Sequence, residues 1–137
     1  MSIGIEYHVS DVEATIAFWE VFGFRVTRRW EDWLRMNRPA EGPLGGAVEA
    51  AEIIIQGDAG LRTRDHYFTP HLDRFPRGVG VEITLEVADV EAAYAVAQAA
   101  GLRVVKAIQD RDWKARDFRL ADPDGFFVRV TSPLRHG

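Results

Sequence analysis

The chain matches itself when its sequence is shifted by 78 residues. The run Asp11-Val12-Glu13-Ala14 then falls on Asp89-Val90-Glu91-Ala92. Single positions that fix structure also coincide, with Ile5 on Ile83, Val9 on Val87, Gly23 on Gly101, Arg25 on Arg103 and Val26 on Val104. Self-similarity at a fixed spacing indicates a repeated supersecondary unit. The sequence therefore predicts two copies of one unit within 137 residues, the length of a single domain.

Each copy begins with an alternation of apolar and polar residues, which predicts a strand with one face on a core. The apolar positions are Ile3, Ile5, Tyr7 and Val9 in copy one and Val81, Ile83, Leu85 and Val87 in copy two. A helix follows, which we expect to start at a capping box of Ser10 and Glu13 in copy one and at Asp89 in copy two. Gly23 and Gly101 are the expected left-handed stops.

Three more strands are expected after each of these glycines. The patterns place them at about 24–30, 33–37 and 52–56 in copy one and at about 103–109, 115–120 and 126–131 in copy two. The repeated unit is thus strand–helix–strand–strand–strand, and the fold class is α+β. We expect one domain, 1–137, with module one at about 1–57, a linker at about 58–79 and module two at about 80–133.

Composition excludes several kinds of function. The chain has no cysteine, so it can form no disulfide, thiolate nucleophile or sulfur-ligated metal site. Its net charge of −4 gives no basic surplus for nucleic acid. No apolar run approaches the length of a membrane span, and no basic, then apolar stretch at the start indicates a signal peptide. A cytoplasmic protein that binds neither nucleic acid nor membrane is the expectation.

The order of motifs resembles the vicinal-oxygen-chelate superfamily, which contains glyoxalases, bleomycin resistance proteins and extradiol dioxygenases. The resemblance rests on Val9-Ser10-Asp11, Ala17-Phe18-Trp19, Phe22-Gly23-Phe24, Gly80-Val81-Glu82-Ile83, Arg116-Asp117-Phe118 and Asp122-Pro123-Asp124-Gly125-Phe126. The Phe-Trp pair on the first helix and the position of Trp113 are most similar to the bleomycin-resistance branch. The resemblance implies two half-barrel sheets with helices outside and a ligand-binding cleft between the sheets.

The same resemblance assigns residues to the cleft and tests for a metal. Inward positions of the first strands are Gly4, Glu6 and His8 in copy one and Glu82, Thr84 and Glu86 in copy two. Relatives that use a metal place ligands on the first and last strands of each module, and here two of these positions hold Gly4 and Arg129. The matching last-strand residue of copy one is Glu52, Ile54 or Gln56, which spacing does not decide. We therefore expect no metal and no other cofactor.

Two hypotheses follow from these positions. The first is that an ion pair between Arg129 and Glu82 occupies the place where relatives hold their metal ion, because a charge in a partly enclosed cleft needs a partner. The second, an alternative, is a displaced metal site formed by His8, Gln56 and Glu86.

Aromatic residues favour a binding function. Trp33 and Trp113 have acidic neighbours, a combination that suits a flat cationic ligand through stacking and cation–π attraction. The leading interpretation is a metal-free protein that sequesters a small cationic or aromatic molecule, such as an antibiotic of the bleomycin type. Its expected ligand-binding cleft consists of Glu6, His8, Trp33, Glu82, Glu86, Trp113 and Arg129. The alternatives are a metal-dependent glyoxalase or other lyase, thiol transferase or dioxygenase with a displaced site, and a non-catalytic dimer with a vestigial cleft.

The resemblance also implies a homodimer with clefts at the subunit interface. The aromatic residues Tyr67, Phe68 and Phe75 of the linker would then lie at the cleft rim or in the interface. The sequence names no catalytic residue.

Overall fold

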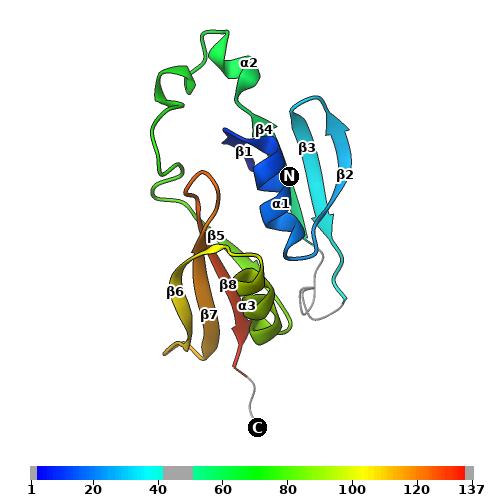
Figure 1. Cartoon of the computed structure of the whole chain (residues 1–137), viewed down its shortest axis with the longest axis vertical. Coiled ribbons are helices and arrows are strands. Elements are labelled where there is room, and N and C mark those ends of the chain that lie inside the picture. Colours follow the sequence, from blue (N-terminus) through cyan, green and yellow to red (C-terminus); the bar gives the residue numbers. More distant parts are fainter. Residues whose placement is uncertain (1–2, 42–50, 135–137) are drawn as a thin grey trace.

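The computed structural model describes residues 3–41 and 51–134. Module one forms a four-stranded sheet, sheet one, with the strand order β1-β4-β3-β2 and one helix (Figure 1). β1 pairs with β4 in parallel, whereas the other neighbours are antiparallel. The elements are β1 (Glu6–Val9), α1 (Val12–Glu20), β2 (Arg25–Trp30), β3 (Trp33–Arg38) and β4 (Ala51–Gly57).

Module two repeats this architecture as sheet two, with the strand order β5-β8-β7-β6. Here too the first strand pairs in parallel with the last one, and the other pairs are antiparallel. The elements are β5 (Glu82–Glu86), α3 (Val90–Ala99), β6 (Arg103–Asp110), β7 (Ala115–Ala121) and β8 (Phe127–Pro133). The α+β prediction of two βαβββ modules is confirmed, and every expected strand overlaps an observed one.

The two helices cover the same side of the molecule (Figure 1). Their apolar residues, with Phe18 and Trp19 on α1 and Ala93 and Ala97 on α3, join the buried faces of both sheets in one core. Neither α1 nor α3 lies on the opposite face of each sheet, which we call its open face. β2 is exposed along its whole length, and β6 is exposed at most positions.

The helix starts differ from the expectation in copy one. The N-cap of α1 is Asp11, whose side chain accepts a hydrogen bond from the Ala14 backbone N–H at 3.0 Å. The N-cap of α3 is the equivalent residue, Asp89. The predicted capping box of Ser10 and Glu13 is therefore wrong. The predicted stops at Gly23 and Gly101 are right, since both have positive φ values, 86° and 69°.

The first residues of each expected strand are not under a helix. Ile3 and Ile5 are 87% and 77% exposed, and Val81 is 56% exposed. The strands begin only at Glu6 and Glu82, so these residues precede the pairing with β4 and β8. Alternation predicts a strand with one apolar face, but it does not tell where the neighbouring strand and helix end.

Residues 58–81, the linker, connect β4 to β5. The linker contains the short helix α2 (Ala59–Arg62) and a 3-10 turn, η1 (Thr69–His71). Leu61 and Leu72 of the linker are buried, at 1% and 4% exposure. Among the described residues, no helix has the length and apolar character needed to cross a membrane.

Candidate functional site

The open face of sheet one is organised in rows, because residues directly opposite on neighbouring strands point to the same side. One row crosses the sheet through paired residues of β2, β3, β4 and β1: Trp30, Trp33, Gln56 and His8. The next row is Arg28, Arg35, Ile54 and Glu6. Two tryptophans, a histidine and an amide therefore share one strip of surface.

His8 connects this strip to the linker. Its ring meets the Phe68 ring edge-on, with 5.1 Å between the centroids, and lies 6.2 Å from the His66 ring. Burial lowers the pKa of the His8 imidazole, so the ring is neutral at pH 7. His8, a predicted cleft residue, thus offers an uncharged aromatic ring. Its contact with Phe68 was not foreseen, because nothing in the linker sequence indicates where that segment folds back.

The open face of sheet two has a different character. Its rows are Gln109, Asp117, Thr131 and Glu86, then Lys106, Arg119, Arg129 and Thr84. Asp117 is fully buried and pairs with Arg111, Oδ1 to Nε, at 2.8 Å. Where sheet one offers aromatic rings, sheet two offers charged and hydroxyl groups.

The predicted Arg129–Glu82 contact exists, in a loose form. Arg129 Nε lies 3.5 Å from Glu82 Oε1. It donates no hydrogen bond to that carboxylate, and among the described residues the guanidinium donates only through Nη2, to Thr84 Oγ1 at 3.4 Å. The pair is an ion pair without a hydrogen bond, so it neutralises Arg129 only in part.

The strand register decides which residue of copy one matches Arg129. Arg129 pairs with Thr84, and Thr84 is the repeat equivalent of Glu6, which pairs with Ile54. The matching residue is therefore Ile54. An alkyl chain and a guanidinium offer no lone pair to a cation. The residues at the family's metal position do not fit a metal ion.

The alternative metal site of His8, Gln56 and Glu86 stays a prediction. His8 and Gln56 are register partners on β1 and β4, so two of its three residues are neighbours. Glu86 belongs to sheet two, on β5. Among the described residues, no group of three or more histidine and acidic side chains could hold a metal.

Trp33 and Trp113 are not brought together within the chain. Trp33 lies at the β2–β3 hairpin, whereas Trp113 is 57% exposed at the β6–β7 hairpin, at the opposite end of the molecule (Figure 1). One of the acids near Trp113 has a partner of its own, since Asp110 pairs with Arg116 at 2.8 Å. This pairing reduces the negative charge near Trp113, and the role of Trp113 in a binding cleft stays a prediction.

The expected rim residues are exposed, with Tyr67 at 81%, Phe68 at 39% and Phe75 at 54%. Phe68 reaches the open face of sheet one through His8. The Phe75 ring lies under the Arg77 guanidinium at 5.1 Å. Their assignment to a rim or a dimer interface stays a prediction.

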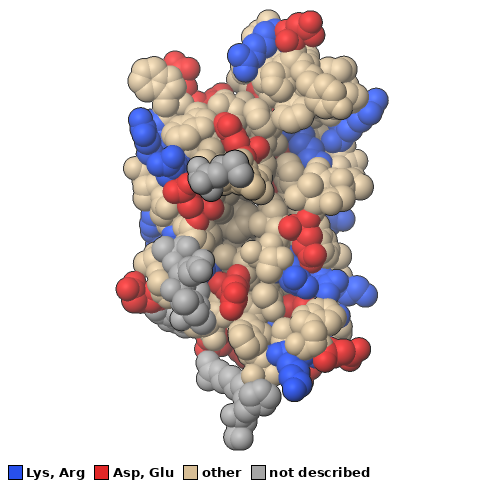
Figure 2. Space-filling model, turned by 180° about the vertical axis from the view of Figure 1, so that it is seen from behind, with Lys and Arg blue, Asp and Glu red and all other residues tan. Residues whose placement is uncertain are grey.

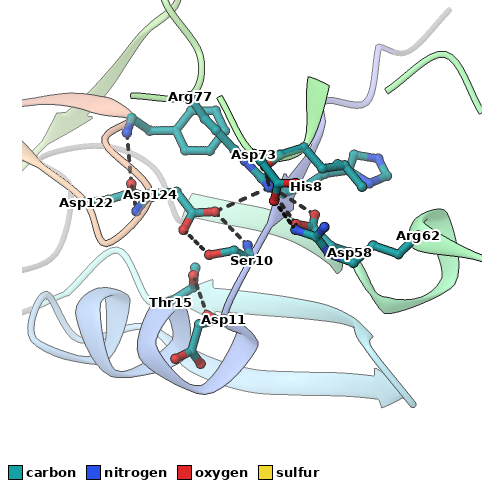
Figure 3. Close-up of polar contacts among 12 residues, drawn as sticks. His8, Ser10, Asp11, Thr15, Asp58, Arg62, Asp73, Arg77, Asp122 and Asp124 are labelled. Carbon is teal, nitrogen blue, oxygen red and sulfur yellow. Dashed lines mark hydrogen bonds and ion pairs between the residues drawn. The ribbon is translucent and has the colours of Figure 1, made fainter. Parts of the chain in front are cut away.

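A polar joint between the modules was missed by the sequence analysis (Figure 3). Arg77 of the linker donates to both carboxylate oxygens of Asp58, at 2.9 and 2.5 Å, and to the backbone carbonyls of Leu72 and His8. Asp124 of module two lies 3.5 Å from Arg77 Nη1 and accepts two hydrogen bonds of 2.6 Å from Ser10. Ser10 thus connects the modules instead of capping α1.

Asp122, in the same turn as Asp124, makes the stability of the folded protein depend on pH. Burial raises the pKa of its carboxyl to about 6, although its Oδ1 accepts from the backbone N–H groups of Asp124 and Phe126. An acid whose pKa is raised on folding holds its proton more tightly in the folded state. Its contribution to stability is therefore lost as the pH rises from about 4 through 6.

Replacing Asp122 should remove this penalty. The Asn side chain keeps an oxygen for both N–H groups but cannot ionise. Relative to the wild type, we expect Asp122→Asn to gain about 2 kcal/mol in free energy of unfolding between pH 4 and pH 7.5. Urea unfolding at several pH values measures this difference. The exposed Asp112→Asn variant is the control, and a difference between Asp122→Asn and wild type that does not change with pH would contradict the expectation.

Comparison with known proteins gives a family and a set of structural relatives. A family model described as the glyoxalase/bleomycin resistance protein/dioxygenase superfamily matches residues 5–130. A glyoxalase/bleomycin resistance protein/dioxygenase from Nocardioides is 21% identical, covering 98% of this chain and 83% of that one, with a TM-score of 0.67. No curated protein matches.

Two of the similar structures are bleomycin proteins. The bleomycin resistance determinant encoded on transposon Tn5 is 17% identical, covering 97% of this chain and 98% of its own, with a TM-score of 0.67. A bleomycin-binding protein in complex with bleomycin is 18% identical, covering 96% and 98%, with a TM-score of 0.66. At these identities the likeness shows the fold.

Proposed function

We propose a function for this chain on the premise that it belongs to the glyoxalase/bleomycin resistance protein/dioxygenase superfamily. It is a binding protein that holds a small, flat, cationic molecule against the open face of sheet one. A bleomycin-type antibiotic is the model ligand, since a solved relative carries bleomycin. The observation on which the proposal depends is the row Trp30–Trp33–Gln56–His8.

The row provides stacking surface at both ends. Trp30 is 74% exposed, and its register partner Trp33 is half-buried beside it. At the other end, His8 and Phe68 present two more rings. Flat ligands stack on such rings, and cations gain further attraction from the faces of tryptophan. A neutral His8 does not repel a cation.

A carboxylate beside the row supports a cationic ligand. Glu6 is in the adjacent row and is exposed, and that row also contains Arg28 and Arg35. Figure 2 shows the face turned away from the helices, where acidic side chains stand around a hollow near the middle. Carboxylates beside a hollow raise the local concentration of cationic ligands.

We further propose that a second copy of the chain covers the open faces. Both faces look away from the helices, and large rings are exposed on the open face of sheet one, with Trp30 at 74% and Phe68, which contacts His8, at 39%. Apolar surface of this kind is typical of interaction sites. The cleft would then be shared between two chains, and we expect Trp113 of a partner to lie near the module that carries Trp33.

Titration of the protein with bleomycin and with a simple cationic aromatic probe, benzamidine, tests the proposal. Binding should raise the melting temperature of the wild type. Trp33→Ala should bind about tenfold more weakly, because a stacked ring contributes about 1–2 kcal/mol. Gln98→Ala, on the exposed side of α3, is the control. Trp113→Ala tests whether a second copy of the chain contributes to the cleft. This change should weaken binding only if the cleft is shared between two chains.

The proposal fails if neither compound raises the melting temperature, or if Trp33→Ala binds as the wild type does. At the last-strand positions where metal-using relatives are expected to hold their ligands, Ile54 and Arg129 offer no lone pair to a cation. The displaced site of His8, Gln56 and Glu86 stays a separate prediction.

A further inference from the structure

Three basic residues stand side by side on the open face of sheet two. Lys106 on β6 is opposite Arg119 on β7, and Arg119 is opposite Arg129 on β8. Side chains directly opposite on neighbouring strands have Cβ atoms about 5 Å apart, and like charges in that position repel. The row ends at the Thr84 hydroxyl on β5. Such a row of cations requires a source of compensating negative charge.

The other copy of the unit shows that the fold itself does not require this row. The equivalent row of sheet one is Arg28, Arg35, Ile54 and Glu6. Both rows carry cations on the second and third strands of the module, β2 and β3 or β6 and β7. They differ on the last and first strands, where sheet one has an isoleucine and a carboxylate and sheet two has Arg129 and Thr84. The fold therefore tolerates an uncharged residue where module two carries its third cation.

Protein carboxylates neutralise the row only in part. Glu82 lies 3.5 Å from Arg129 Nε, and Asp117 lies 3.7 Å from Arg119 Nε but is held more closely by Arg111, at 2.8 Å. Within the described residues, the Nε atoms of Arg119 and Arg129 make no hydrogen bond. Both side chains are largely buried, at 22% and 26% exposure. Each of the two guanidinium groups thus has a buried Nε–H without an acceptor, while part of its side chain stays open to solvent.

A pocket adjoins the row and gives space for the rest of a ligand. Glu82 and Phe127 are the next pair on the same face, two residues along β5 and β8 from Thr84 and Arg129. They line a shallow pocket of about 430 Å³, whose other side is formed by linker residues 76–81. The Arg119 guanidinium lies over the Phe127 ring at 5.9 Å. Basic side chains gather on this part of the face, over β6 and β7 in the lower half of Figure 2.

We propose that Arg119 and Arg129 bind an oxyanion, a carboxylate or a phosphate, of a small organic ligand whose body occupies the pocket beside Phe127. The paired guanidinium groups offer the parallel N–H donors that such oxyanions accept. The inference deepens the proposed function, on which it rests for the use of the open faces. It adds that the ligand carries an anionic group in addition to its cationic, aromatic part.

The test uses the full-length wild-type chain with two probes, benzoate and inorganic phosphate, at an ionic strength held constant with NaCl. NMR of the arginine Nε–Hε groups should show concentration-dependent shifts for Arg119 and Arg129. If benzoate binds more tightly than phosphate, the anionic group of the ligand is a carboxylate. If phosphate binds more tightly, it is a phosphate group. Arg129→Ile, which installs the residue of module one, should weaken binding at least tenfold. Arg28→Ala, a cation of the equivalent row in sheet one, should change it less than twofold.

The inference is overturned if neither probe shifts these signals, or if Arg28→Ala weakens binding as much as Arg129→Ile does. If Arg129→Ile does not fold, the wild-type NMR titration still decides. The two proposals fail separately. Benzamidine binding that is retained in Arg129→Ile, with no binding of either anion to the wild type, would overturn only the oxyanion site. Anion binding without any response to bleomycin or benzamidine would overturn only the cationic ligand.

Discussion

Arg77→Met should destabilise the protein by about 3–5 kcal/mol, because it leaves buried carboxylates without their cation. The side chains of Asp58 and Asp124 are 3% and 2% exposed, and Arg77 itself is 9% exposed. The hydrogen bond to Asp58 raises the pKa of Arg77, so the guanidinium stays charged. Methionine fills similar volume, so the loss reflects the charge and its hydrogen bonds.

Urea denaturation of the full chain at pH 7 measures this loss. Arg74→Met, three residues earlier in the linker and exposed, is the control and should change stability by less than about 0.5 kcal/mol. In Asp58→Asn/Arg77→Met the cost should be smaller than the sum of the single changes, since the Asp58 carboxylate, which is paired with Arg77 in the wild type, is then no longer present to be left unpaired. A loss below 1 kcal/mol in Arg77→Met would contradict the role of this joint.

The contacts of Arg77 with Asp58 and Asp124 show which features of the fold the sequence repeat could predict and which it could not. The repeated alternation, caps and glycines act within a module, over distances of a few residues, so they predicted the two βαβββ units. Arg77, Asp58 and Asp124 come together from three segments that have no common period. The turn Asp122-Pro123-Asp124-Gly125 was evident in the sequence, but its contact with Ser10 was not.

The open faces show a second limit of the sequence analysis. An offset of 78 residues relates the first strands and the helices, but Arg35 corresponds to Arg119 and Ile54 to Arg129. Hairpins of different length and bulges in β2 and β6 change the offset along the chain. A one-residue error in register moves a side chain to the other face of a sheet. A constant offset of 78 therefore does not identify the structurally equivalent residues of the later strands.

The strand register shows how the open faces of the two copies differ in chemistry. The position of Trp33 in sheet one is that of Asp117 in sheet two, and the position of Ile54 is that of Arg129. Sheet one carries apolar side chains at positions where sheet two carries charged ones. Two faces with different chemistry on one scaffold suit a ligand with two different ends, which agrees with both proposals made above.

The last connection between the modules depends on a close approach at Gly78. Its φ is +70°, and a Cβ there would overlap the Phe126 ring, with Cε1 at 2.6 Å. Gly80, two residues later, has a φ of +94° with nothing within 4 Å. The two glycines thus share a left-handed backbone and differ in the space around them. They form a matched pair for separating backbone strain from packing.

Gly78→Ala should therefore cost about 3 kcal/mol and Gly80→Ala about 1 kcal/mol. A left-handed residue with a Cβ costs about 1–2 kcal/mol, partly offset because alanine lowers the entropy of the unfolded chain. Both variants share these effects, so the remaining difference of about 1–3 kcal/mol measures the overlap with Phe126. Thermal and urea unfolding give the two values. In a Phe126→Leu background the difference should shrink, since the ring that meets the new methyl group is gone; an unchanged difference would mean that Gly78 is needed for its backbone conformation alone.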